Sequence, residues 1–115
     1  MKLLMIVLND EDLVEPLLAT LKENGVQSGT LIDTQGMNSL LYDLHPQQIP
    51  LFGSFRMWAS NLHPSNKTFF SVIENDIEHK VLNVINQVFQ GFENPGKGIA
   101  FTIPLDNVVG YRKYE

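Results

Sequence analysis

Two strand–helix–strand patterns, separated by a long segment, are the feature of this sequence that most restricts its fold. The first pattern begins with a continuous apolar run, Leu3 to Leu8, which is typical of a strand covered on both faces in the middle of a sheet. A helix is predicted next, because leucines at a four-residue spacing form one apolar stripe: Leu13, Leu17 and Leu21. Asn24 and Gly25 favour a left-handed end to this helix. A second strand is predicted over Val26 to Gln35.

The second pattern occupies the C-terminal half of the chain. A strand is predicted over Thr68 to Ile73, where β-branched and aromatic residues gather. The helix that follows has an apolar face formed by Ile77, Val81, Val84, Ile85 and Val88. A last strand is predicted over Ile99 to Ile103 and is ended by Pro104, and Val108 with Val109 predicts a short edge strand.

Both predicted helices begin with the pattern of a capping box, in which a polar side chain at the helix start and an acidic side chain three residues later bond to the backbone. In the first helix the pair is Asp12 and Glu15, and in the second it is Asn75 and Glu78. We therefore expect the helices to begin at these pairs.

The order of these elements predicts an α+β fold, the ferredoxin-like βαββαβ sandwich, in a single domain over residues 1–115. The segment 36–67 is then a long insertion between the second and third strands. Right-handed crossovers place both helices on one face of the sheet and leave the other face open. Because Phe69 and Phe70 give the third strand apolar side chains on both faces, we expect the open face to be covered, most economically in a symmetric oligomer.

The composition argues against several classes of function. Eight basic residues against thirteen acidic ones give a net charge of −5, and no basic run is present, so we expect no nucleic-acid partner. The absence of cysteine excludes disulfides, zinc thiolates and cysteine nucleophiles. The histidines, His45, His63 and His79, lack metal-ligand spacing, so no metal site is predicted. No apolar segment is long enough to span a bilayer, and we expect a cytoplasmic protein that is not inserted in a membrane.

Residues 91–98, GFENPGKG, match a nucleotide-binding P-loop except at the last position, where Gly98 replaces the hydroxyl residue. In a P-loop, a strand delivers the glycines to the start of a helix, whose N–H groups hold the phosphates. Here the segment follows a helix and precedes a strand, so the P-loop interpretation fails. A turn at Pro95-Gly96 is the simplest alternative.

From Met1 to Arg112 the sequence resembles the PII family of nitrogen-regulatory signal-transduction proteins, in particular its short PII-like members. The blocks that carry the resemblance are KLLMIVL, ENGV, TLIDTQGM, NKTFFSVIE and GKGIAFTIPLDNVVG. PII proteins are trimers that bind ATP or ADP at clefts between subunits and contact their targets through a long T-loop. The resemblance therefore implies a homotrimer and an adenine nucleotide as the effector.

The same resemblance implies a phosphate site of another kind in the glycine-rich segment, formed by backbone N–H groups around Gly96 and Gly98 with Lys97 beside them. Ile99 stands where the family has a lysine.

Further effector-binding residues follow from the resemblance. Thr30 matches the threonine that PII proteins place near the adenine, and Gly36 matches the glycine at the base of the T-loop. Arg112 matches the second arginine of the C-terminal Arg-x-Arg, while Gly110 stands in place of the first.

The segment 36–67 corresponds to the T-loop and is far longer than most connections within a domain. As a partner-docking loop it offers Tyr42, Phe52, Phe55, Arg56 and Trp58. The resemblance suggests a membrane transporter or a metabolic enzyme as the target. Alternatively, the apolar residues of this segment fold back over the open sheet face or into a subunit cleft.

The leading hypothesis is a non-catalytic regulator without a required cofactor, which binds a small effector and signals through the 36–67 loop. No catalytic residues are predicted, because Asp10, Asp12, Asp33 and Asp43 have no nucleophile or base beside them and are typical of caps and turns. Two alternatives stay open. One is a small ferredoxin-like enzyme that uses the open sheet face as a pocket, and the other is a structural trimer without a ligand.

Overall fold

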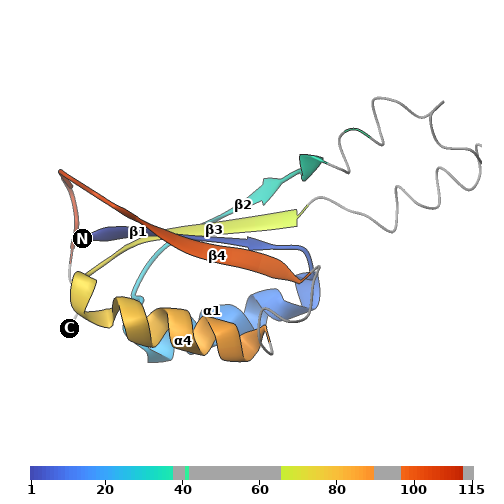
Figure 1. Ribbon diagram of the computed structural model, residues 1–115, viewed down its shortest axis with the longest axis horizontal. Helices are drawn as coiled ribbons and strands as arrows, with labels where there is room; N and C mark the ends of the chain where they lie inside the picture. Colours follow the sequence, from blue (N-terminus) through green and yellow to red (C-terminus); the bar gives the residue numbers. More distant parts are fainter. Residues whose placement is uncertain (38–40, 42–65, 90–96, 113–115) are drawn as a thin grey trace, which may run out of the picture.

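The computed structural model describes residues 1–37, 41, 66–89 and 97–112 of the chain. Its strands form one antiparallel sheet in the order β2-β3-β1-β4. The strands are β1 (Lys2–Leu8), β2 (Thr30–Thr34), β3 (Asn66–Ile73) and β4 (Gly98–Pro104). The helices are α1 (Val14–Glu23) and α4 (Glu78–Val88), each entered through a short 3₁₀ turn, η1 (Glu11–Leu13) and η3 (Asn75–Ile77). Both helices lie on the same side of the sheet (Figure 1).

This arrangement confirms the predicted α+β class and the ferredoxin-like fold. The long insertion is also confirmed, since β2 ends at Thr34 and its neighbour β3 begins at Asn66. No helix among the described residues is long and apolar enough to cross a membrane.

The core lies between the sheet and the two helices. Alternate residues of β1 and β3 point into it, and the apolar stripes of α1 and α4 cover them. Its members are Leu4, Ile6, Leu8, Leu17, Leu21, Val26, Phe69, Ile73, Val81, Ile85 and Phe89. The predicted apolar face of the second helix ended one residue early, because Phe89, just after the helix, is almost fully buried. Val84, predicted to be buried, is only half-buried.

The predicted capping boxes are wrong. The carboxylate of Asp10, not Asp12, accepts the capping hydrogen bond, from the backbone N–H of Asp12 at 3.0 Å. Glu78 accepts a hydrogen bond from the Thr102 hydroxyl at 2.6 Å and lies 3.7 Å from the Lys2 ammonium. The physical reason is that the chain enters each helix through a 3₁₀ turn, so the predicted pairs do not occupy the capping positions. Glu78 instead ties α4 to β4 and β1.

Replacing Glu78 with glutamine is predicted to reduce the loss of stability in acid. The hydrogen bond from Thr102, helped by Lys2, outweighs partial desolvation and holds the pKa of Glu78 below its ordinary value of 4.5. A carboxylate whose pKa is lowered by folding adds stability above its unfolded-state pKa, and this stability is lost as the pH falls through the folded-state pKa. Urea denaturation from about pH 6 to about pH 3 should therefore show a steeper fall for wild type than for Glu78→Gln. Parallel curves, or a Glu23→Gln control on α1 with the same effect, would count against this ion pair.

The second strand and the C-terminal edge differ from the predictions. Pairing of β2 begins at Thr30, because the residues before it cross from α1 to the sheet edge and Val26 is buried in the core on the way. No strand forms at Val108 and Val109, and Val109 is 100% exposed. The last printed backbone contact of this end runs from the Leu105 N–H to the Met1 carbonyl at 3.1 Å, beyond which the chain leaves the sheet.

The face of the sheet opposite the helices is apolar and is called here the open face. The strand registers and the alternation of side chains place nine apolar residues on it: Leu3, Met5, Val7, Ile32, Phe70, Val72, Ile99, Phe101 and Ile103. The other positions are Thr30, Thr34, Thr68 and Asn66, so none is charged. Ile99 is 55% exposed and Phe101 39% exposed. The prediction that the third strand is apolar on both faces is confirmed.

Candidate functional site

One end of the sheet gathers the start of β4 and the two strand ends that border the 36–67 segment. At this end β1 and β2 finish while β3 and β4 begin (Figure 1). Gly98, the first residue of β4, pairs with Leu8. Just beyond it, the backbone N–H of Asn9 donates to the carbonyl of Lys97 at 2.9 Å. The Lys97-Gly98 part of the glycine-rich segment is therefore held on the end of β1.

Gly98 has no room for a side chain. A Cβ atom at this position would lie 2.4 Å from the Val7 carbonyl oxygen and 3.2 Å from the ring of Phe89. Real Cβ atoms do not approach a backbone oxygen so closely. Packing of β4 against β1 is thus sufficient to explain this glycine, whatever its role toward a ligand.

A set of polar side chains, called here the sheet-end network, crosses the same end: Asn9, Thr34, Asn66 and Thr68. The Asn66 amide donates to the Asn9 side-chain oxygen at 2.9 Å. The Thr34 hydroxyl donates to the Asn66 carbonyl at 3.3 Å and lies 2.7 Å from the Thr68 hydroxyl. Through Asn9 and Asn66, contacts run from Lys97 to the residues on both sides of the 36–67 segment.

Gly36 lies next to this network. A Cβ atom at Gly36 would be 3.3 Å from the Asn66 amide nitrogen. The structure therefore brings Gly36 into the same neighbourhood as Lys97 and Gly98, as contacts of one chain of polar groups. Sequence reasoning missed Asn9 and Asn66. The available signal was an asparagine directly after one apolar strand and another directly before the next.

Lys67 forms ion pairs on the helix side of this end, with Asp33 across the β2–β3 ladder and with Glu11 at 3.8 Å. The hydrogen bond to Asp33 raises the pKa of Lys67 above its ordinary value. Its positive charge is therefore engaged by acidic neighbours. Among the described residues, no ion pair involves Lys97 or Arg112.

Thr30 lies beside a hollow of about 290 Å³ at the outer edge of the sheet. Its walls are Ser28, Gly29, Thr30, Phe70, Ser71 and Val72. The Ser71 hydroxyl donates to the Ser28 carbonyl at 2.5 Å and fixes the chain where it enters β2. The hollow offers an aromatic ring and an exposed threonine hydroxyl to a small ligand.

The predicted effector residues do not all meet within one chain. Thr30 is on β2 and Gly98 on β4, the two outer strands, which are about 14 Å apart at ordinary strand spacing. Arg112 is exposed and follows the opposite end of β4 (Figure 1). Only a neighbouring chain could bring Arg112 to the Gly98 end. Gly96 and the predicted docking residues, Tyr42, Phe52, Phe55, Arg56 and Trp58, lie outside the described residues, as do His45 and His63.

Metal-ligating side chains do not cluster in the part of the chain that the structure describes. A comparison with protein-family models finds no match, and no curated protein sequence matches the chain significantly. The relationship that is established is therefore the ferredoxin-like fold.

Proposed function

We propose that this protein is a PII-like, non-catalytic regulator that works as a homotrimer. A small effector, with adenine nucleotides as the first class to test, binds at the subunit clefts. The 36–67 loop then reports its presence to a protein target such as a membrane transporter or a metabolic enzyme. The observation that carries this proposal is the sheet-end network, because it connects Lys97 at the glycine-rich segment with Asn66 at the end of the loop.

The open face supports assembly into a trimer. Nine apolar side chains and no charged one occupy its ladder positions, and several of them are exposed in a single chain. Large exposed apolar patches on a protein usually mark contacts with another molecule. A closed, symmetric arrangement of identical chains would bury all copies of this face together.

The position of Arg112 supports an effector site shared between chains. Thr30 and its hollow can take the base, and Lys97 with the backbone at Gly98 can take an anionic group, but these lie on opposite sheet edges of one chain. In the proposed trimer the two halves of a site come from neighbouring chains, with Arg112 adding a positive charge. Charge-assisted hydrogen bonds of this kind are the strong ones in phosphate recognition.

The open face argues for regulation over catalysis at that surface. Acid–base catalysis needs a titratable group within hydrogen-bond reach of the substrate. The ladder positions of the open face carry only apolar side chains, threonines and Asn66. An enzyme that used this face would have to obtain its catalytic groups from elsewhere.

Calorimetry with ATP, ADP, AMP and a cyclic dinucleotide tests the proposal. We expect saturable binding of at least one of them, without turnover. Lys97→Ala and Arg112→Ala should each weaken binding by about 1.5 to 3 kcal/mol, the usual scale for a hydrogen bond to a charged group. Lys80→Ala, on the exposed surface of α4, is the matched control and should bind like wild type.

Two results would oppose this function. The nucleotide assignment is wrong if wild type binds none of the four compounds, or if all three variants bind as wild type does. Turnover of a bound nucleotide would instead support an enzyme.

A further inference from the structure

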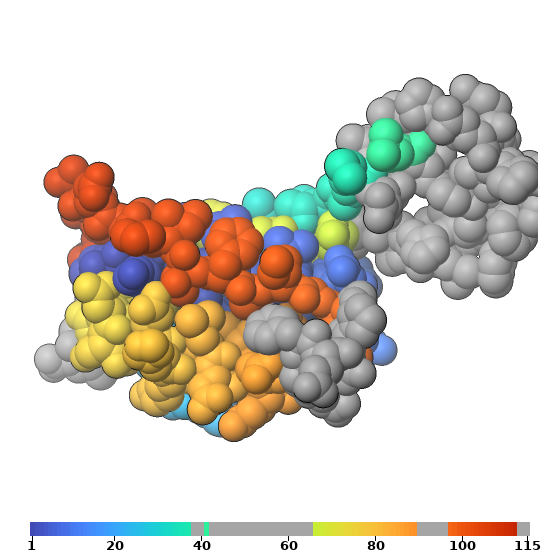
Figure 2. All heavy atoms as spheres, viewed as in Figure 1, coloured from blue at the N-terminus to red at the C-terminus, as the bar shows by residue number. Residues whose placement is uncertain are grey.

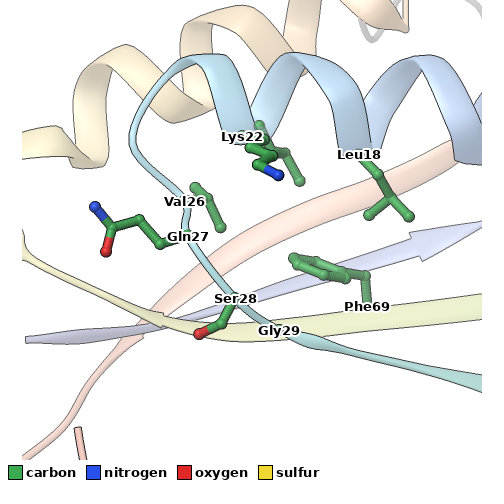
Figure 3. Close-up of a pocket in the computed structure, with 8 residues that line it drawn as sticks. Leu18, Lys22, Val26, Gln27, Ser28, Gly29 and Phe69 are labelled. Atoms are coloured by element: carbon green, nitrogen blue, oxygen red, sulfur yellow. The ribbon is translucent and has the colours of Figure 1, made fainter. Parts of the chain in front are cut away.

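A second cavity lies on the helix side of the sheet, between α1 and the segment that leads into β2. It has a volume of about 150 Å³ and is separate from the sheet-end network. Leu18, Leu21, Lys22, Val26, Gln27, Ser28, Gly29 and Phe69 line it (Figure 3). Its existence does not depend on the proposed function.

The floor of this cavity is a fixed aromatic ring. Phe69 is 6% exposed, and its ring occupies the space that a side chain at position 29 would need. A Cβ atom at Gly29 would lie 2.3 Å from the ring. The glycine therefore lets the backbone pass close over the ring and leaves the ring face toward α1.

The opposite wall combines an apolar side chain with a positive charge. Figure 3 shows Leu18 and Lys22 extending from α1 toward the sheet, above Phe69, while the polar ends of Gln27 and Ser28 point away. Lys22 is exposed, and no ion pair within the described residues involves it.

The helix itself gives Lys22 no acidic partner. Side chains three or four positions apart are neighbours on a helix surface. On the N-terminal side these positions hold Leu18 and Ala19, and on the C-terminal side Gly25 and Val26. The ammonium group is thus available to an anion that enters the cavity.

We propose that this cavity binds a small monocarboxylate with an apolar body of about six carbons, because a cavity of this volume accepts a benzene-sized group. The apolar body lies between Leu18 and the ring of Phe69, and the carboxylate meets the Lys22 ammonium. Benzoate and cyclohexanecarboxylate are the simplest compounds with this shape and charge.

Titration of the ¹⁵N-labelled full chain with benzoate, followed by amide chemical shifts at constant ionic strength, tests this site. We expect saturable shifts at Leu18 to Lys22, at Val26 to Gly29 and at Phe69, with a dissociation constant on the order of 1 mM for so small a ligand. Cyclohexanecarboxylate should act like benzoate. Benzyl alcohol should bind more weakly, and benzylamine should not bind, because its charge has the wrong sign.

Variants separate the two halves of the site. Lys22→Ala should weaken benzoate binding about fivefold, the effect expected of one exposed charge pair. Leu18→Trp should abolish it by filling the cavity, with thermal unfolding as the check that this variant folds. Lys80→Ala is the matched control, an exposed helix lysine away from the cavity, and should bind like wild type.

The proposal is overturned if benzoate causes no saturable shifts at these amides, or if benzylamine binds as well as benzoate. It is also overturned if Lys22→Ala and Lys80→Ala bind benzoate equally. None of these outcomes bears on nucleotide binding, which is measured separately and involves other residues.

Discussion

Replacing Gly98 with alanine is expected to lower the free energy of unfolding by about 3 kcal/mol, at the upper end of the range for overpacking. The new methyl group would lie 2.4 Å from the Val7 carbonyl oxygen, and a backbone atom in the middle of a ladder cannot move aside like a flexible side chain. The start of β4 must therefore separate from β1, and the hydrogen bond from Asn9 to Lys97 is strained with it. Urea denaturation followed by circular dichroism measures the loss.

Gly110→Ala is the matched control for this change. Gly110 has a positive φ of 88°, but nothing lies within 4 Å of its Cβ position. Its substitution should cost only the conformational strain of a left-handed residue, about 1 kcal/mol. If Gly98→Ala keeps wild-type stability, the close packing of β4 on β1 is wrong, and the glycine has to be explained by a ligand instead.

Replacing Phe70 with aspartate is expected to dissociate the proposed trimer into folded monomers. Phe70 lies on the open face opposite Met5, away from the core between sheet and helices. In a single chain the new carboxylate can reach water, but in an assembly that buries the open face it is an unpaired buried charge. Such a charge costs about 3 to 5 kcal/mol, which corresponds to a fall in association constant of more than about a hundredfold. Size-exclusion chromatography with circular dichroism checks mass and folding together.

Phe101→Asp is the second variant, in case Phe70→Asp does not fold. Phe101 lies in the same row of the open face and is 39% exposed, so its replacement disturbs the single chain less. Leu31→Asp is the control. Leu31 is 40% exposed but faces the helix side of β2, so the same charge should leave an open-face assembly intact. Equal dissociation by Leu31→Asp would show that the open face is not the contact.

The architecture could be predicted because each element carries its own pattern. The apolar run of β1 and the leucine stripe of α1 are local signals, and the handedness of crossovers then determines which face the helices cover. The helix starts could not be predicted equally well. Asp12 and Asn75 fit the capping pattern, but 3₁₀ turns occupy those positions, and Glu78 finds its partner, Thr102, on a strand 24 residues later.

The candidate site was predictable only in part. Gly36, Lys97 and Gly98 were identified from the sequence, and they do lie at one end of the sheet. The reason for Gly98 was not predictable, because its contact with Val7 exists only in one register of β4 against β1. The link between Asn9 and Asn66 joins residues 57 positions apart and likewise depends on strand pairing. A sequence pattern states which residues are polar, whereas the register decides which of them meet.

The surface of the molecule shows how the two faces of the sheet differ in their surroundings. The helices cover one side, and the strands form the other side of the compact body (Figure 2). Ile99 and Ile103 are exposed on the open face of β4, at 55% and 44%. Burying them is the largest apolar gain that self-association offers to this fold, at about 25 cal/mol for each Å² removed from water.

Sedimentation equilibrium of the wild-type protein at micromolar concentration tests the central claim most directly. A trimer that buries the open face should sediment as a single species of three times the 13.0 kDa chain mass, and this mass should not change with moderate salt, because the contact is apolar. A single species of 13.0 kDa across the same concentrations would contradict the claim. The proposed effector site between chains would then be wrong as well, since Arg112 would have no neighbouring chain to reach.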